Sequence, residues 1–431
     1  MRAGPSHEEV RRHNLGTLLR YVHVHGATSR AELTTKLGLN RSTIGTLTTE
    51  LAAAGLVTER PPEETLRAGR PSLVVRPESY QVYAYALAIE VDRLRAARVG
   101  LGGKILDRRE TDRPRGMQVA DAVQPLAEFI HEMRRDVPEG ARYVGGGLAV
   151  AGMVRRDDGM VRLAPTIGWV EEPVGEALSS ELRGFEGADV GPLTVGNIAD
   201  VSAMVEHSRG AAVDHDNVIY LYGDVGVGGG IIAGGRRVTG HGGYGGEVGH
   251  MVINPSGKPC SCGSRGCWET EIGEYALLEL AGRANESGRD AVLGVVDAAM
   301  RGDRAAQQAV RQVGDWIGLG VGNLINIFNP EAVIFGGTLR DVYLVAAAQI
   351  RSRLNEVALP SLPRTRPAPH PRAGHGRGPD RRRGAGLRTA AGGPAPLSVR
   401  RPRPVGGRGL HCPREHAGLR SGPSATPAPA G

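Results

Sequence analysis

Residues 247–269 read EVGHMVINPSGKPCSCGSRGCWE, and this stretch holds three of the four cysteines in a chain of 431 residues. The cysteines follow a histidine, and the four residues are His250, Cys260, Cys262 and Cys267. One imidazole and three thiolates form the ligand set of a closed tetrahedral zinc site. Because a closed site leaves no position for water or substrate, we expect a structural Zn²⁺ that fixes a loop, rather than a chance cluster of cysteines.

Outside this stretch, short apolar runs, glycine turns and amphipathic segments predict an α/β fold. Residues 218–222 (VIYLY) are typical of a buried strand, and they run into the glycine loop 226–230 (GVGGG). Residues 119–135 have the spacing of an amphipathic helix, and residues 143–150 that of another buried strand. Glycines after a strand let backbone amides approach a phosphate or another ligand, but a tight β-turn explains them equally well.

The wider pattern resembles the ROK family. The resemblance rests on Glu247 and His250 before the spaced cysteines, on Glu269 after them, and on the segments 229–235 (GGIIAGG) and 329–337 (NPEAVIFGG). Members of this family are sugar kinases and sugar-responsive transcription factors. The resemblance therefore implies an α/β, actin- and hexokinase-like (ribonuclease H-like) domain with two lobes.

The resemblance also implies four sugar-binding residues. In the family, one Asn, two Glu and one His contact sugar hydroxyls, and the matching residues here are Asn197, Glu247, Glu269 and His250. His250 would then serve both zinc and sugar; the alternative is that it serves zinc alone. Thr166 stands where an Asn is common in the family. The ligand is therefore expected to differ from glucose or to bind weakly.

Three differences from the family's kinases argue against phosphoryl transfer. The first phosphate loop, Asp-x-Gly-Gly-Thr in kinases, reads EVDRL over residues 90–94, and the second reads Asp224-Val225-Gly226, without a hydroxyl. Ile198 replaces the Asp that acts as general base, and such a base commonly contributes about 10²–10⁴ in rate. We therefore expect no catalytic residues and no enzymatic activity.

The first eighty residues predict a winged helix-turn-helix that binds DNA. A first helix ends at Gly26, Ser29 with Glu32 forms a capping box for a second helix, and Asn40 caps a third. Small hydroxyls and one Arg lie at the outward start of the third helix, and a wing adds a second Arg. The expected DNA contacts are Arg41, Ser42, Thr43, Thr46 and Arg70. The alternative is a small helical domain that binds another protein.

The sequence thus predicts four parts: the winged helix-turn-helix over residues 1–80, lobe 1 over 81–205, lobe 2 with the zinc loop over 206–362, and a tail over 363–431. The tail contains 13 Pro, 13 Gly and 14 Arg, and it accounts for the net charge of +7, since the rest of the chain carries −5. It cannot bury enough apolar surface to fold, so we expect it to be disordered. It is either a flexible basic extension or a product of a shifted reading frame, which would leave lobe 2 incomplete and the protein poorly soluble.

Together these features predict a DNA-binding transcription regulator, a repressor rather than an activator, controlled by a sugar in a catalytically dead kinase-like domain. We expect a homodimer, because a symmetric pair of helix-turn-helix units suits a palindromic operator. The sequence has neither a signal peptide nor a run of about 18 apolar residues, so we expect a cytoplasmic protein. The alternatives are a sugar kinase that phosphorylates a hexose with ATP, and a regulator controlled by a protein partner.

Overall fold

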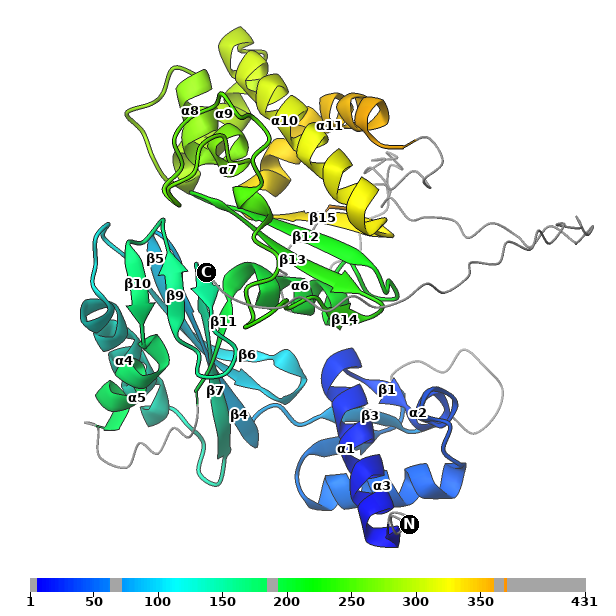
Figure 1. Cartoon of the computed structure of the whole chain (residues 1–431). Helices are drawn as coiled ribbons and strands as arrows, with labels where there is room; N and C mark the ends of the chain where they lie inside the picture. The colour runs from blue at the N-terminus through cyan, green and yellow to red at the C-terminus, as the bar shows by residue number, and fades with distance from the viewer. Residues whose placement is uncertain (1–5, 63–71, 184–192, 360–367, 370–431) are drawn as a thin grey trace, which may run out of the picture. The chain divides into compact units, whose positions relative to one another are not determined.

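The α/β fold predicted from the sequence is confirmed by the computed structural model, which describes residues 6–62, 72–183, 193–359 and 368–369 (Figure 1). An N-terminal helical unit precedes two five-stranded sheets with their helices. No helix in the described ranges is both long and apolar enough to cross a bilayer. Arg70 and nearly all of the predicted tail lie outside these ranges.

The N-terminal unit combines three helices with a three-stranded antiparallel sheet of order β1-β3-β2. Its elements are α1 (His7–His25), β1 (Thr28–Ser29), α2 (Arg30–Leu37), α3 (Arg41–Ala53), β2 (Val57–Arg60) and β3 (Val74–Pro77). Ser29 and Asn40 cap α2 and α3 as predicted, each accepting a bond from the backbone amide three residues on. At Ser29 this bond from the Glu32 amide is one half of a capping box, whereas Ser6 and Glu9 form a complete box at the start of α1.

One apolar core joins these helices to the sheet. Leu18 from α1, Leu33 from α2 and Ile44 from α3 are fully buried and pack with Val57 and Val75 of the sheet. The buried positions of α3 lie on one side of the helix, so its other side is left for solvent or a ligand.

The first five-stranded sheet has the order β11-β7-β4-β5-β6. The pairs β4–β5 and β5–β6 are antiparallel, and the pairs β4–β7 and β7–β11 are parallel. Its elements are β4 (Val82–Ile89), β5 (Arg93–Gly100), the short helix η1 (Leu101–Gly103), β6 (Ile105–Asp112), α4 (Val119–Arg135), β7 (Arg142–Val150), α5 (Val174–Arg183) and β11 (Leu193–Asn197). Helices α4 and α5 lie together beside this sheet (Figure 1) and share its apolar core. A small sheet of β8 (Met153–Val154), β9 (Val161–Ala164) and β10 (Trp169–Glu172) joins the same core.

The second five-stranded sheet has the order β14-β13-β12-β15-β16. Its strands are β12 (Val218–Gly223), β13 (Val227–Ala233), β14 (Arg236–Arg237), β15 (Ala332–Gly336) and β16 (Ala368–Pro369), and its helices include α8 (Glu274–Leu280), α9 (Arg289–Met300), α10 (Arg304–Phe328) and α11 (Gly337–Val357). Tyr220 of β12 packs toward α6, while Ile219 and Leu221 pack into the core of the later helices. Burial on both faces explains the continuous apolar run that marked this strand in the sequence.

Helix α6 (Ile198–Arg209) links the two sheets. It begins directly after β11 of the first sheet and packs against β12 and β13 of the second. Asn197 is its N-cap. The predicted boundary between residues 205 and 206 falls inside this helix, and the division into four parts stays a prediction.

Candidate functional site

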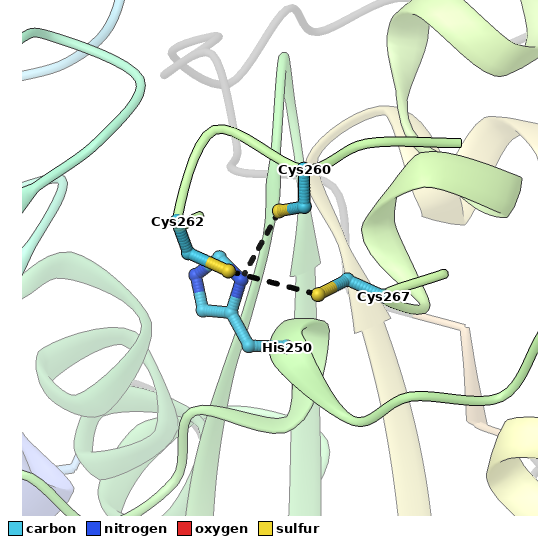
Figure 2. Close-up of side chains that lie close together, drawn as sticks. All are labelled: His250, Cys260, Cys262 and Cys267. Carbon is cyan, nitrogen blue, oxygen red and sulfur yellow. Dashed lines mark hydrogen bonds between the residues drawn. The ribbon is translucent and has the colours of Figure 1, made fainter. Parts of the chain in front are cut away.

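His250 and the three cysteines converge in lobe 2 (Figure 2). Their ligand atoms all lie within 4.8 Å of one another; Nδ1 of His250 is 3.6 Å from Sγ of Cys260, and Sγ of Cys262 is 3.7 Å from Sγ of Cys267. Zinc bonds of about 2.3 Å to sulfur and 2.0–2.1 Å to nitrogen require tetrahedral edges of roughly 3.5–3.8 Å. The donor set and these two distances match one tetrahedral zinc ion, while the full set of donor atoms lies within 4.8 Å.

The backbone around the cluster is fixed by the packing of lobe 2. Two isolated β-bridges, Val252 to Cys267 and Pro259 to Arg265, hold the loop together. Trp268 follows directly; it is fully buried, and its Nε1 donates to the carbonyl of Trp316 in α10 at 2.8 Å. The ligands are thus positioned by a rigid core rather than by the metal alone.

Two thiols of the cluster are protonated when no metal ion is bound. Burial raises the pKa of Cys260, and its hydrogen bond to Glu269 raises that pKa further; burial also raises the pKa of Cys267. Sγ of Cys260 donates to Oε1 of Glu269 at 2.9 Å, which requires a protonated thiol. A bound metal ion would replace these protons, since coordinating thiols are deprotonated outright.

All four predicted sugar-binding residues line one cavity of about 290 Å³. Asn197 precedes α6, Glu247 precedes the short helix η2 (Val248–His250), His250 ends η2, and Glu269 begins α7 (Glu269–Ile272). The structure therefore brings the four side chains together from three places in the chain. Their contact with a sugar stays a prediction.

Asn197 already makes three hydrogen bonds within the protein. Its Oδ1 accepts from the amides of Ala199 at 2.8 Å and Asp200 at 3.2 Å, and its Nδ2 donates to the carbonyl of Gly152 at 2.8 Å. A carboxamide has two N–H donors, so one donor is left for a ligand. Asn197 thus fixes the start of α6 and offers at most one N–H to the cavity.

The two glutamates differ in their surroundings. Burial raises the pKa of Glu247 to about 7, and the carboxylates of Asp200 and Glu269 raise it too. Glu269 accepts from the Val227 amide at 3.4 Å through Oε2, in addition to its bond with Cys260. Both carboxyl groups can accept hydrogen bonds from sugar hydroxyls, and a protonated Glu247 can also donate one.

Sequence reasoning missed two further carboxyl groups in the cavity, those of Glu90 and Asp224. Burial raises the pKa of Glu90, and it raises the pKa of Asp224 to about 7, where the charges of nearby carboxylates add to the effect. The sequence indicates them only as parts of the two altered phosphate loops, where the carboxylates of Glu90 and Asp92 would repel ATP. Their position directly after the strands β4 and β12 was the available signal, because ligands of α/β proteins bind at the carboxyl ends of strands.

Apolar side chains form another part of the cavity wall. Ile198 lies there, as do Val91, Met153, Leu163 and Pro165, and Thr166 completes this part. Ile198 thus lines the cavity at the sequence position where the family's kinases have their general base.

The DNA-binding residues predicted in α3 lie on its outer side. Arg41, Ser42 and Thr46 are exposed and Thr43 is partly buried. Oγ of Ser42 donates to Oδ1 of the N-cap Asn40 at 2.7 Å, and Oγ1 of Thr46 donates to the Ser42 carbonyl at 3.1 Å. Both hydroxyl oxygens can still accept bonds. DNA contact by these residues stays a prediction, as does that of Arg70, which lies outside the described ranges.

Comparisons with known proteins agree with this architecture. The chain matches the ROK family over residues 84–378, and it belongs to this family. It is 28% identical over 344 residues to a putative xylose repressor of Caldicellulosiruptor sp. (strain Rt8B.4), covering 77% of this chain and 84% of the relative. It is 36% identical over 224 residues to a glucokinase of Streptomyces coelicolor, covering 47% of this chain and 68% of the relative.

A solved structure resembles the chain over most of its length. It is a ROK family transcriptional regulator described as a homologue of the E. coli Mlc protein. The TM-score is 0.63 at 26% sequence identity, and the similarity covers 81% of this chain and 89% of that chain. It covers more of this chain than the solved structure of a ROK family glucokinase from Streptomyces griseus, which covers 66% at a TM-score of 0.55 and 28% sequence identity.

Proposed function

We propose that this protein is a transcriptional repressor whose affinity for operator DNA is controlled by a sugar in the cavity lined by Asn197, Glu247, His250 and Glu269. The observation that carries the proposal is the extent of the similarity. In sequence, the chain resembles a repressor over 77% of its length and the glucokinase of Streptomyces coelicolor over 47%. In structure, it resembles a regulator over 81% and a glucokinase over 66% of its length. Xylose is the first effector to test, because the relative from Caldicellulosiruptor is described as a putative xylose repressor.

The same proposal excludes phosphoryl transfer. Ile198 in the cavity cannot accept a proton from a sugar hydroxyl, and the carboxyl groups of Glu90 and Asp224 occupy the positions of the phosphate loops. A kinase is the second candidate, since the identity with the glucokinase is 36%. ATP consumption by the purified protein in the presence of a hexose would favour the kinase, and its absence at high protein concentration would favour the repressor.

Operator binding is proposed for a homodimer in the cytoplasm, with Arg41, Ser42, Thr43 and Thr46 at the DNA and Arg70 in a minor groove. In a mobility-shift assay with the chain's own promoter, Arg41→Ala should weaken binding by the roughly 1–3 kcal/mol of a lost guanine contact. Arg301→Ala, at the exposed end of α9, is the matched control and should bind like the wild type. Equal binding by both variants would remove Arg41 from the interface.

Helix α6 connects the cavity with the N-terminal unit. It begins at Asn197 in the cavity and ends at Arg209, whose Nη1 donates to the carbonyl of Gly102 at 2.6 Å. The amide of Gly102 donates to Nδ1 of His23 in α1 at 3.0 Å. Burial and the charges of Arg209 and Arg20 lower the pKa of His23, which keeps the imidazole neutral and able to accept this bond. We propose that a sugar bound to Asn197 acts on the N-terminal unit through this helix and turn.

The decisive test is a sugar titration of the complex between protein and operator. A hundredfold change in operator affinity requires a coupling free energy of about 3 kcal/mol between the two sites. If a panel of sugars binds the protein but none changes its operator affinity, control by sugar is wrong. If the affinity for DNA changes only when a second protein, isolated together with this chain, is added, the regulator is controlled by a protein partner.

A structural zinc ion is proposed for His250, Cys260, Cys262 and Cys267. We expect one zinc per chain by elemental analysis, and chelation should lower the unfolding temperature. Cys262→Ser should reduce the zinc content, whereas Cys412→Ser, which changes the one cysteine outside the cluster, should not. Full zinc content in the Cys262→Ser variant would contradict the site.

A further inference from the structure

The charges around the cavity indicate which sugars it accepts. Four of its lining residues are carboxylic acids: Glu90, Asp224, Glu247 and Glu269. Within the described part of the chain, none of its lining residues is Lys or Arg. His250 also lines the cavity, but its Nδ1 faces Cys260 in the proposed zinc cluster. A ligand in this cavity therefore meets several acids and no guanidinium or ammonium group.

Two of the cations that act on Glu90 and Asp224 are already engaged by acids. Nη1 of Arg95 is 3.0 Å from Oε1 of Glu90, and its Nε is 3.5 Å from Oε2 of Glu110. Arg289, whose charge acts on Asp224, forms an ion pair with Asp341 at 2.8 Å. Neither guanidinium is a free counter-charge for an anion in the cavity.

A neighbouring cavity has two cationic side chains in its wall, so it has to be considered as a second place where a phosphate could bind. It shares Thr166, Gly226 and Glu269 with the first cavity, and Arg115 and Lys258 lie in its wall. Lys258 forms an ion pair with Glu279, and Arg115 lies over the ring of Tyr275, 5.3 Å from its centroid. Arg115 is therefore the first group to test in the neighbouring cavity as a holder of phosphate, and the experiment must include it.

We infer that Glu90 and Asp224 are specificity residues that restrict the effector to uncharged, non-phosphorylated sugars. This inference rests on the proposed control by a sugar. A phosphate monoester carries about −1.5 to −2 charges at pH 7. In a partly buried cavity, its repulsion by the ionised fraction of these carboxyl groups is screened less than in water. Uncharged sugars avoid this repulsion, and their hydroxyls can donate to the carboxyl oxygens.

Calorimetric titration of the full chain with matched pairs tests the inference. The ligands are D-xylose, D-glucose and N-acetyl-D-glucosamine, each beside its phosphate monoester. The free sugar that binds should do so at least about tenfold more tightly than its phosphate, which corresponds to about 1.4 kcal/mol. The double variant Glu90→Gln with Asp224→Asn should bring this ratio closer to one. Glu128→Gln, on the exposed side of α4, removes one carboxylate elsewhere and should leave the ratio unchanged.

Each other outcome has a definite meaning. If a sugar phosphate binds as tightly as the free sugar, the inference is wrong, and loss of that binding in Arg115→Ala would assign the phosphate to the neighbouring cavity. If the double variant folds, as shown by its thermal unfolding, but keeps the wild-type ratio, Glu90 and Asp224 are not the specificity residues. If no sugar in the panel binds with or without phosphate, the inference and the proposed control by a sugar both fall. Binding of free sugars with no effect on the operator would overturn the control alone.

Discussion

At the scale of single residues, Asp224 gives the clearest pH dependence. Its pKa is raised to about 7, first by burial and then by the carboxylates of Asp92, Glu90 and Glu274, while Arg289 opposes the shift. Because the folded-state pKa lies above the unfolded value, the folded protein loses stability as the pH rises from about 4 to about 7. Asp224→Asn cannot ionise, so it should stabilise the protein by about 1–3 kcal/mol at pH 8 and by less at pH 5.

Chemical denaturation at both pH values measures this difference. Glu128→Gln, an exposed carboxylate on α4, serves as the control and should change stability little at either pH. A stabilisation by Asp224→Asn of the same size at pH 5 and pH 8 would show that Asp224 does not titrate in this range.

At the scale of elements, two glycines within helices should respond in opposite ways to alanine. A Cβ at Gly320 in α10 would overlap the buried indole ring of Trp268, whereas a Cβ at Gly16 in α1 meets no atom within 4 Å. Gly320→Ala should therefore destabilise the protein by about 1–3 kcal/mol, since an extra methyl group in a packed core forces side chains to shift. Gly16→Ala should stabilise α1 by up to about 1 kcal/mol, because alanine has the higher helix propensity.

Thermal unfolding of the two variants measures both changes in stability, a decrease for Gly320→Ala and an increase for Gly16→Ala. Gly320→Ala should also lower the retention of the proposed zinc ion, because Trp268 directly follows Cys267, one of its proposed ligands. A Gly320→Ala protein as stable as the wild type would mean that α10 and the zinc loop pack less tightly than described.

The elements also show what the sequence could predict. Residues 119–135 form α4 with the predicted bounds, because seven buried apolar residues recur at helical spacing. The cluster of His250 and three cysteines could be predicted because all four residues lie within one short segment. Glu90 and Asp224 could not be placed together in the same way, since they follow strands of two different sheets. The three bonds of Asn197 likewise depend on Gly152, which is distant in sequence.

At the scale of the whole molecule, the proposed control depends on α6 as a connection. Arg209→Ala removes the bond to the Gly102 carbonyl at the far end of this helix. The variant should still bind sugar and operator. In the wild type, a hundredfold change in operator affinity on sugar binding corresponds to a coupling free energy of about 3 kcal/mol. In Arg209→Ala, the ratio of operator affinities without and with sugar should fall toward one. Sugar calorimetry and mobility shifts measure the three quantities separately. With Arg301→Ala as the control, a full response in Arg209→Ala would show that the signal takes another route.

Glu269 belongs to two sites at once: one of its oxygens accepts from Cys260 and the other from the amide of Val227, beside the cavity. A sample in which only some chains hold the proposed zinc ion would then contain two populations, in which this carboxylate is oriented differently. Titrations of such a sample would give less than one effector per chain, and the shortfall would match the missing metal. Metal content therefore has to be known before any stoichiometry of effector binding is interpreted.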